Sequence, residues 1–154
     1  MKLMTLILTA LCVFVESALA SRGEFGAQNR LIGWKTNCDF SGLGTAKFVI
    51  VQAAPAVALT GILATVTTSS NILGVLQNKP KVGEAMEIAQ EGLSKVVAGG
   101  ALTANAIFTT NGSGRAAAVT SGDFAVGRIL EASGSDGDVV TAQLFFPVRW
   151  TGAA

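Results

Sequence analysis

From Lys47 to Trp150, short runs of β-forming residues alternate with turns rich in glycine and polar residues. The runs cover residues 47–54, 72–78, 93–100, 124–132 and 139–150. Between the third and fourth runs, Asn111-Gly112 and Ser113-Gly114 stand between two further β-capable stretches, as in a hairpin. Short strands at even spacing, separated by glycine turns, are typical of a small barrel or sandwich. The sequence therefore predicts an all-β (mainly β) compact domain over residues 47–154.

Two stretches inside this domain are ambiguous. Residues 56–66 are mostly apolar, and so short an apolar run fits a strand or a helix. Residues 83–92 contain good helix formers but are barely two turns long. Because Met86 and Ile88 alternate there with Glu87 and Ala89, we favour a half-buried strand. In the run at 124–132, Gly127 suggests a β-bulge.

The residues before the domain divide into two parts. Residues 1–20 form a hydrophobic leader with a charged start, an apolar run and a small-x-small ending, the pattern of a secretory signal peptide. A start site set too far upstream, or a real amphipathic or buried arm, would explain the same segment. Residues 21–46 read as an extended N-terminal arm and loop, with a short strand at Arg30–Lys35. The apolar anchors of this arm are Phe25, Leu31, Ile32 and Trp34.

The composition argues against most catalytic devices. The chain has no histidine, so a Ser-His-Asp or Cys-His device and a histidine-bearing zinc site are ruled out. The two cysteines, Cys12 and Cys38, are too few for a structural zinc site, although a disulfide between them is possible. Lys and Arg number 11 against 10 Asp and Glu, which gives no sign of nucleic-acid binding. We expect no enzyme, no cofactor, no metal and no small-molecule substrate.

Several local patterns have an ordinary structural explanation. Asp136-Gly137-Asp138 lacks the six to eight oxygens of a calcium loop and reads as a turn. Gly112-Ser113-Gly114, followed by Arg115, lacks Walker spacing and reads as a hairpin tip. We interpret Cys38 as a free structural thiol and Trp150 as a core residue. Three glutamates are expected to be solvated charges: Glu84, Glu87 and Glu91.

An ordered set of motifs resembles the phage capsid decoration (cement, head-stabilising) proteins of the DUF2190-like group. The motifs are "GVLQNKP", "VGE", "MEIAQEGLSKVVAGGALTAN", "TTNGSGRAAAV" and "VGRILEASGSDGDVVTAQL", and together they span Gly74 to Leu144. "GAQNRLIGWK", Gly26 to Lys35, is similar to the start of some members. Two features depart from the family: residues 1–24 have no counterpart, and Asn105 stands where a glycine is common. Asn tolerates the positive φ that such a glycine would adopt.

The resemblance implies a β-barrel protein without catalysis that sits on the outer surface of a phage head, commonly as a homotrimer bound to the major capsid protein. Charged residues make up only 14% of the chain, against about 25% in ordinary soluble domains, which is typical of proteins that hide surface in an assembly. We expect the arm to dock by strand addition on a neighbouring subunit or on the major capsid protein, with Phe25, Leu31 and Trp34 as anchors. An edge strand of its own barrel is the alternative for the arm. For the whole chain, the leader supports a second hypothesis, a secreted or surface β-domain such as a fibre subunit or adhesion module.

Overall fold

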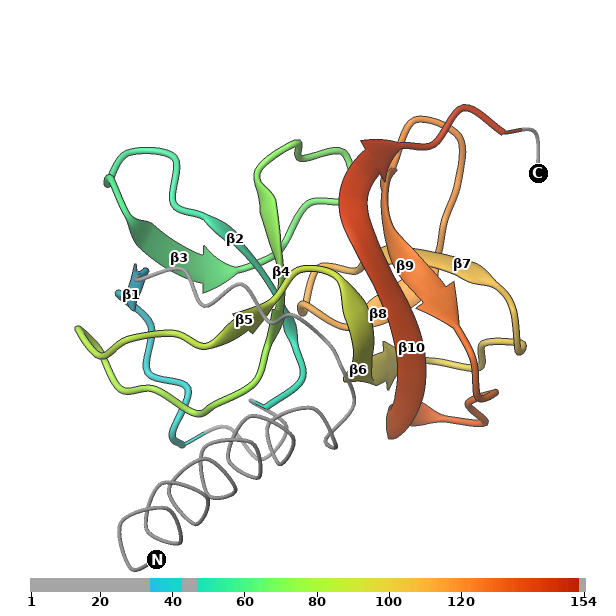
Figure 1. The fold of residues 1–154 in the computed structure, drawn as a ribbon, viewed down its shortest axis with the longest axis horizontal. Coiled ribbons are helices and arrows are strands. Elements are labelled where there is room, and N and C mark those ends of the chain that lie inside the picture. Colours follow the sequence, from blue (N-terminus) through green and yellow to red (C-terminus); the bar gives the residue numbers. More distant parts are fainter. Residues whose placement is uncertain (1–33, 43–46, 153–154) are drawn as a thin grey trace, which may run out of the picture.

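The computed structural model describes residues 34–42 and 47–152, and all regular secondary structure in these residues is β-strand (Figure 1). The predicted all-β fold with a barrel is therefore confirmed. The described residues contain no helix long and apolar enough to cross a membrane.

The strands form a five-stranded sheet followed by a closed five-stranded barrel (Figure 1). In the sheet the spatial order is β1-β3-β2-β4-β5, and in the barrel it is β10-β6-β8-β7-β9. The strands of the sheet are β1 (Lys35–Thr36), β2 (Ile50–Ala53), β3 (Thr60–Leu63), β4 (Ile72–Leu76) and β5 (Ile88–Ala89). The strands of the barrel are β6 (Gly92–Gly99), β7 (Ile107–Thr110), β8 (Ala116–Ala118), β9 (Phe124–Ile129) and β10 (Asp136–Arg149).

Most strand pairs are antiparallel, as the short turns require, but two are parallel. β1 runs parallel to β3, with Lys35 opposite Thr60, and β6 runs parallel to β8, with Ala98 opposite Ala116. The hairpin predicted around Asn111-Gly112 is confirmed, because β7 and β8 pair with Thr110 opposite Ala116. Gly114 at its tip adopts a φ of 67°, in the left-handed region that glycine reaches without steric cost.

Two hydrophobic cores lie on opposite sides of the same strands. The first core fills the barrel and its contact with the sheet, and the second lies under residues 34–42. Successive residues of a strand point to opposite faces, so each of four strands supplies both cores. The residue pairs, first core before second, are Ile50 and Val51 on β2, Val75 and Leu76 on β4, Ala89 and Ile88 on β5, and Val96 and Val97 on β6.

The two ambiguous stretches are both extended in the structure. β3 lies within residues 56–66, and β5 lies within residues 83–92. Met86 and Ile88 are buried and Glu87 is exposed, as the predicted alternation requires. Ala89 is buried as well, because β5 pairs with β4 at Ala89 opposite Val75.

The predicted bulge at Gly127 is wrong. Gly127 pairs regularly with Phe108 of β7, and the irregularity between β9 and β10 lies on β10, between Leu144 and Val148. Gly127 serves close packing instead. A Cβ built there would come within 2.5 Å of the Gln143 carbonyl oxygen and 2.7 Å of the Phe108 ring. Asn105 adopts a φ of 69°, the positive φ that its place in the motif calls for.

The segment from Trp34 to Gly42, which belongs to the arm in the sequence-based division, packs against the sheet. The N–H of Lys35 donates to the Leu59 carbonyl at 3.0 Å, and the N–H of Thr36 donates to the Glu84 carbonyl at 3.2 Å. β1 therefore bonds on both sides, to β3 and to the segment that leads into β5. Phe40 is 1% exposed in the second core, and its N–H donates to the Pro80 carbonyl at 3.0 Å.

We predict that Phe40→Ala destabilises the protein by about 3–5 kcal/mol, the usual cost of emptying a buried phenylalanine site. Phe146→Ala is the matched control, because Phe146 is 67% exposed and its truncation leaves no internal cavity. Urea unfolding of the two variants and the native chain measures both changes. Equal, small losses for the two variants would show that residues 34–42 do not belong to the folded unit.

Candidate functional site

Of the three predicted anchors, the structure describes only Trp34; Phe25 and Leu31 lie outside the described residues. Trp34 is half-buried and packs against the second core. Its carbonyl accepts a hydrogen bond from the N–H of Met86 at 2.9 Å. Trp34 therefore contacts its own domain, and the described end of the arm forms a strand of that domain's sheet, between β3 and the segment that leads into β5.

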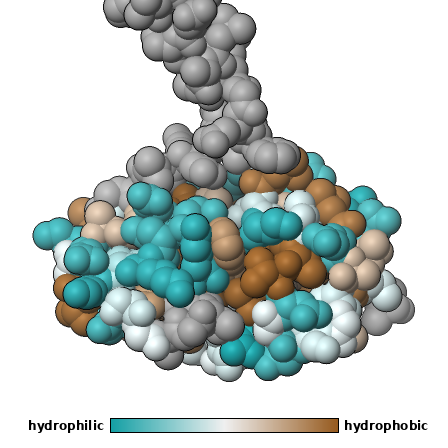
Figure 2. Space-filling model, turned by 90° about the horizontal axis from the view of Figure 1, so that it is seen from below, coloured by the Kyte–Doolittle hydropathy of each residue, from teal (hydrophilic) through white to brown (hydrophobic). Residues whose placement is uncertain are grey.

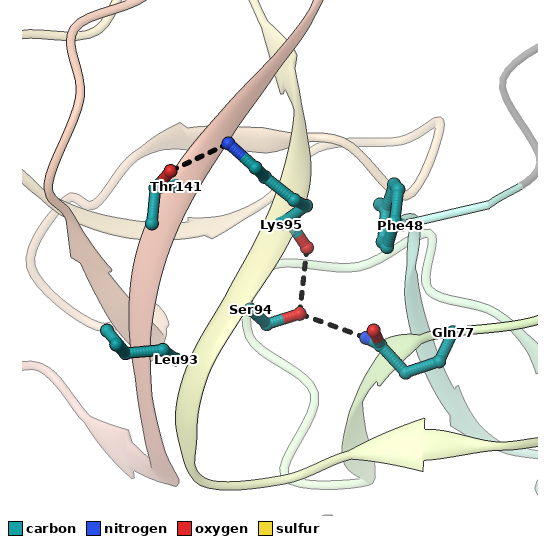
Figure 3. A pocket seen from close by; sticks show the side chains of 6 residues that line it. All are labelled: Phe48, Gln77, Leu93, Ser94, Lys95 and Thr141. Carbon is teal, nitrogen blue, oxygen red and sulfur yellow. Dashed lines mark hydrogen bonds between the residues drawn. The ribbon is translucent and has the colours of Figure 1, made fainter. Parts of the chain in front are cut away.

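A pocket of about 370 Å³ lies where the sheet meets the barrel (Figure 3). Phe48 stands before β2, Gln77 follows β4, and the remaining lining residues come from β6 and β10. Phe48 has a φ of 68°, a strained conformation for a non-glycine residue. The lining residues are Phe48, Gln77, Leu93, Ser94, Lys95 and Thr141.

One wall of this pocket is a chain of hydrogen bonds. The side-chain amide of Gln77 donates to the Val75 carbonyl at 3.0 Å and to the Ser94 hydroxyl at 2.9 Å. The Ser94 hydroxyl in turn donates to the carbonyl of Lys95 at 2.9 Å (Figure 3). These bonds tie β4 to β6, so the polar groups of this wall hold the sheet to the barrel.

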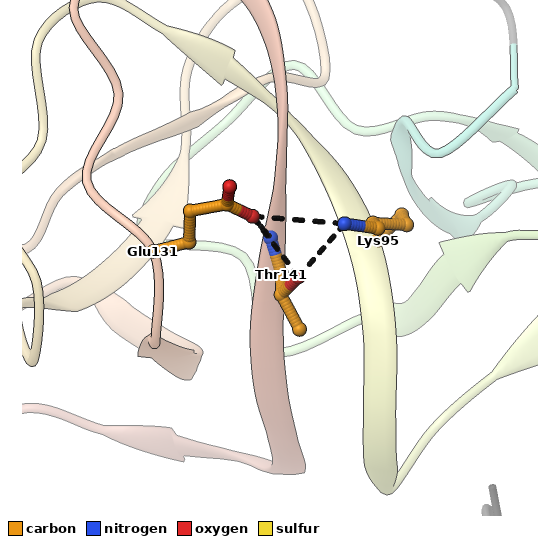
Figure 4. A network of polar contacts seen from close by, with 3 residues as sticks. All are labelled: Lys95, Glu131 and Thr141. Carbon is orange, nitrogen blue, oxygen red and sulfur yellow. Dashed lines mark hydrogen bonds and ion pairs between the residues drawn. The ribbon is translucent and has the colours of Figure 1, made fainter.

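Lys95, Thr141 and Glu131 form a polar network on the outside of the barrel (Figure 4). The ammonium of Lys95 donates to the Thr141 hydroxyl at 2.8 Å and lies 3.6 Å from the Glu131 carboxylate. The Thr141 hydroxyl donates to the same carboxylate at 3.1 Å. The bonds from the Thr141 hydroxyl and N–H, with the charge of Lys95, lower the pKa of Glu131. The network links β6, β10 and the segment after β9 and has the form of a surface ion pair.

The acidic and glycine-rich motifs occupy the roles expected of them. Glu84, Glu87 and Glu91 are exposed. The Asp138 carboxylate accepts hydrogen bonds from the N–H groups of Gly134 and Ser135, at 2.9 and 2.8 Å, within the turn that leads into β10.

The remaining polar candidates also have structural roles. At the hairpin tip, the Asn111 side chain accepts from the N–H groups of Ser113 and Arg115, at 2.9 and 3.0 Å. The Arg115 guanidinium is paired with the Asp136 carboxylate. Cys38 carries a free thiol.

Large apolar side chains are exposed at several places on the molecule. Figure 2 shows one face on which hydrophobic residues gather among hydrophilic ones. The most exposed are Phe146 at 67% and Leu59 and Val82 at 63% each. Others over half exposed are Val57 in the turn between β2 and β3 and Val148 on β10. The sequence does not mark Phe146 and Val148 as exposed, because an apolar residue in a β-run reads as core. The interpretation of Trp150 as a core residue is wrong, because Trp150 lies just beyond β10, where it is half-buried and outside both cores.

The fold is similar to that of the head fiber gp8.5 N base of bacteriophage phi29. The two structures align with a TM-score of 0.55 at 13% sequence identity, over 72% of this chain and 89% of the other. At this identity the likeness shows that the two chains share a fold. No family model matches the sequence, the DUF2190-like group included, and no curated protein matches it.

The end of β10 is held by a turn whose key residue is Asp123. The N–H of Gly122 donates to the Trp150 carbonyl at 2.9 Å, and the N–H of Trp150 donates to the Asp123 carbonyl at 2.7 Å. The Asp123 side chain accepts bonds from the Thr120 hydroxyl at 2.6 Å and the Thr120 N–H at 2.8 Å. Burial acts to raise the pKa of Asp123, but these bonds and one from Thr67 together lower it.

We predict that Asp123→Ala lowers stability at pH 7 by about 1–3 kcal/mol, the usual contribution of hydrogen bonds to a charged group. Because the folded pKa lies below the ordinary 3.8, the native carboxylate contributes fully above pH 3.8. That contribution is lost as the pH falls through the folded pKa, so the difference between native chain and variant shrinks in acid. Thermal unfolding between pH 2 and 7 measures it. Asp136→Ala, at an exposed ion pair, is the control and should lose less than about 1 kcal/mol of stability. If the stability difference between the native chain and Asp123→Ala does not change with pH, the Asp123 carboxylate does not have this role.

Proposed function

We propose that this protein is a structural component of a phage virion, which decorates and stabilises the outer surface of the capsid by binding the major capsid protein. The observation that carries the proposal is the fold it shares with the base of a phage head fiber, over most of both chains. The ordered motifs from Gly74 to Leu144, with their resemblance to capsid decoration proteins, support the same class.

The assembly contact is assigned to the N-terminal arm, which docks on a neighbouring subunit or on the major capsid protein. The described end of the arm is fixed to the sheet through β1, so the chain from Trp34 onward is anchored to the domain. An extended segment binds an exposed sheet edge through main-chain hydrogen bonds, and its alternate side chains give specificity. Since Trp34 already packs on its own core, Phe25 and Leu31 carry the docking contact.

We propose that the protein acts without catalysis and without a cofactor. Its polar side chains at the pocket, the hairpin tip and the turn before β10 bind neighbouring strands and backbone groups. On this proposal the protein acts through its surface, and the exposed apolar residues make the contacts with other proteins.

A secreted or surface β-domain is the second candidate, favoured by residues 1–20. The intact mass of the native protein and its presence on purified phage particles distinguish the two. Loss of the first twenty residues during export supports the secreted protein, and retention of the protein on purified phage particles supports the virion component.

We predict that the protein forms homotrimers, in solution or on the capsid shell. A charge-poor chain with exposed side chains such as Phe146 and Leu59 gains by burying them, at about 25 cal/mol per Å² of apolar surface. Because association costs offset much of that gain, the trimer can be limited to the shell. Light scattering and a reconstruction of decorated capsids test this. Isolated single copies on the lattice would rule out the trimer.

We predict that deleting residues 1–30 leaves the melting point nearly unchanged and abolishes binding to capsids. The described fold begins at Trp34, so its strands and cores remain in the shortened chain. Co-sedimentation with assembled capsids measures binding. Full-length Glu84→Ala and Glu87→Ala are the controls and should bind normally, because exposed charges contribute little. Loss of the fold on deletion would show that the arm belongs to the core.

A further inference from the structure

The second half of β10 has an unpaired edge. β6 pairs with β10 as far as Leu144, which lies opposite Gly92 at the start of β6. On its other side, β10 stays paired with β9 as far as Arg149, opposite Phe124. Figure 1 shows β10 continuing past β6. In the described part of the chain, no strand pairs with residues 145–149 on the β6 side.

This edge also exposes apolar side chains. Phe146 is 67% exposed and Val148, two residues on, is 52% exposed. Pro147 lies between them, and proline within a sheet is confined to edges and bulges because it has no N–H to donate. Open edges of soluble proteins are usually covered, charged, or interrupted by proline or a bulge, since they offer a template to another strand. Pro147 and the irregularity between Leu144 and Val148 interrupt this edge, but Phe146 and Val148 remain exposed on it. A largely exposed phenylalanine on such an edge points to a partner that covers it.

We propose that this edge receives residues 21–33 of a second copy of the chain as an added strand. Thirteen residues of extended chain span at most about 45 Å, well beyond the radius of a small domain. A segment of this length is long enough to contact a neighbouring molecule. In an extended strand, residues an even number apart share a face, so Phe25 and Leu31 would lie on the same side. Such a strand matches an edge whose own exposed residues, Phe146 and Val148, are two apart.

The symmetry of a trimer favours the arm, rather than the β10 edge of another copy, as the partner of this edge. A closed ring of three requires two different complementary patches on each copy, whereas two identical edges that pair with each other make a twofold dimer. The arm and the β10 edge are two such patches. This step rests on the trimer of the proposed function, and it adds the surface that accepts the arm.

Disulfide trapping between two single-cysteine variants tests the contact. In a Cys12→Ser, Cys38→Ser background with the native melting point, Leu31→Cys or Phe25→Cys is mixed with Val148→Cys. A disulfide between the two can form only between copies, and neighbouring strands bring Cβ atoms to about 4.5–5.5 Å, close to disulfide reach. Val139→Cys is the matched acceptor control, since Val139 is 49% exposed on the same strand where β6 pairs with it.

The proposal expects mixed dimers with Val148→Cys and none with Val139→Cys, in concentrated solution or on capsid shells. Failure to trap mixed dimers in both settings overturns it. Dimers of Val148→Cys with itself would show edge-to-edge pairing and overturn it too. So would trapping within one chain of the Leu31→Cys, Val148→Cys double variant that does not depend on concentration.

Capsid binding of the same variants separates this proposal from the proposed function. In the full-length chain, Val148→Asp should lose the trimer and keep its melting point, whereas Val139→Asp should keep both. If native protein binds capsids but no mixed dimer forms, the edge contact is wrong and the virion role stands. If mixed dimers form but the protein does not bind capsids, the virion role is wrong and the edge contact stands.

Discussion

The fold depends on strands that are buried on both faces. In β2, β4 and β6, neighbouring residues point in opposite directions and both are fully buried, one in each core. Each of these strands is therefore a shared wall, and removing the cover from either side would expose a full apolar face. The barrel covers one side. The other side is covered by residues 34–42 with Phe40, and by Met86 and Ile88, which is why the described end of the arm is integral to the domain.

This double burial explains what could be predicted from sequence. Strands with both faces buried read as nearly continuous apolar runs, and the runs around Ile50, Val75 and Val96 are rich enough in β-forming residues to be predicted as strands. Their partners could not be identified, because the parallel pairs β1–β3 and β6–β8 join segments that no local pattern connects. The bulge predicted at Gly127 is wrong for the same reason. A glycine is needed there because the Phe108 ring packs closely against it, and this contact exists only in the folded chain.

The candidate surfaces were predicted less well than the fold. Trp34 was identified as an anchor from its aromatic character, but its place depends on a core that forms only when β1 docks on β3. Phe146 and Val148 were missed, because "FFPV" in a closing strand reads as core. Pro147 was the available signal, since a proline inside a strand indicates an edge. The docking roles of Phe25 and Leu31 stay predictions.

The polar side chains and the exposed apolar side chains of this molecule have different roles. The carboxylates of Asp39, Asp123 and Asp138 each accept backbone N–H groups in a nearby turn, and Asn111 does the same at the hairpin tip. These hydrogen bonds hold the loops in place, and a domain with many short strands has many loops to hold. Besides exposed charges such as Glu87 and Glu91, large apolar side chains also face solvent, with Leu59 and Phe146 the most exposed of them along with Val82. What the surface offers to other molecules is therefore contact area next to available backbone, the combination that strand addition uses.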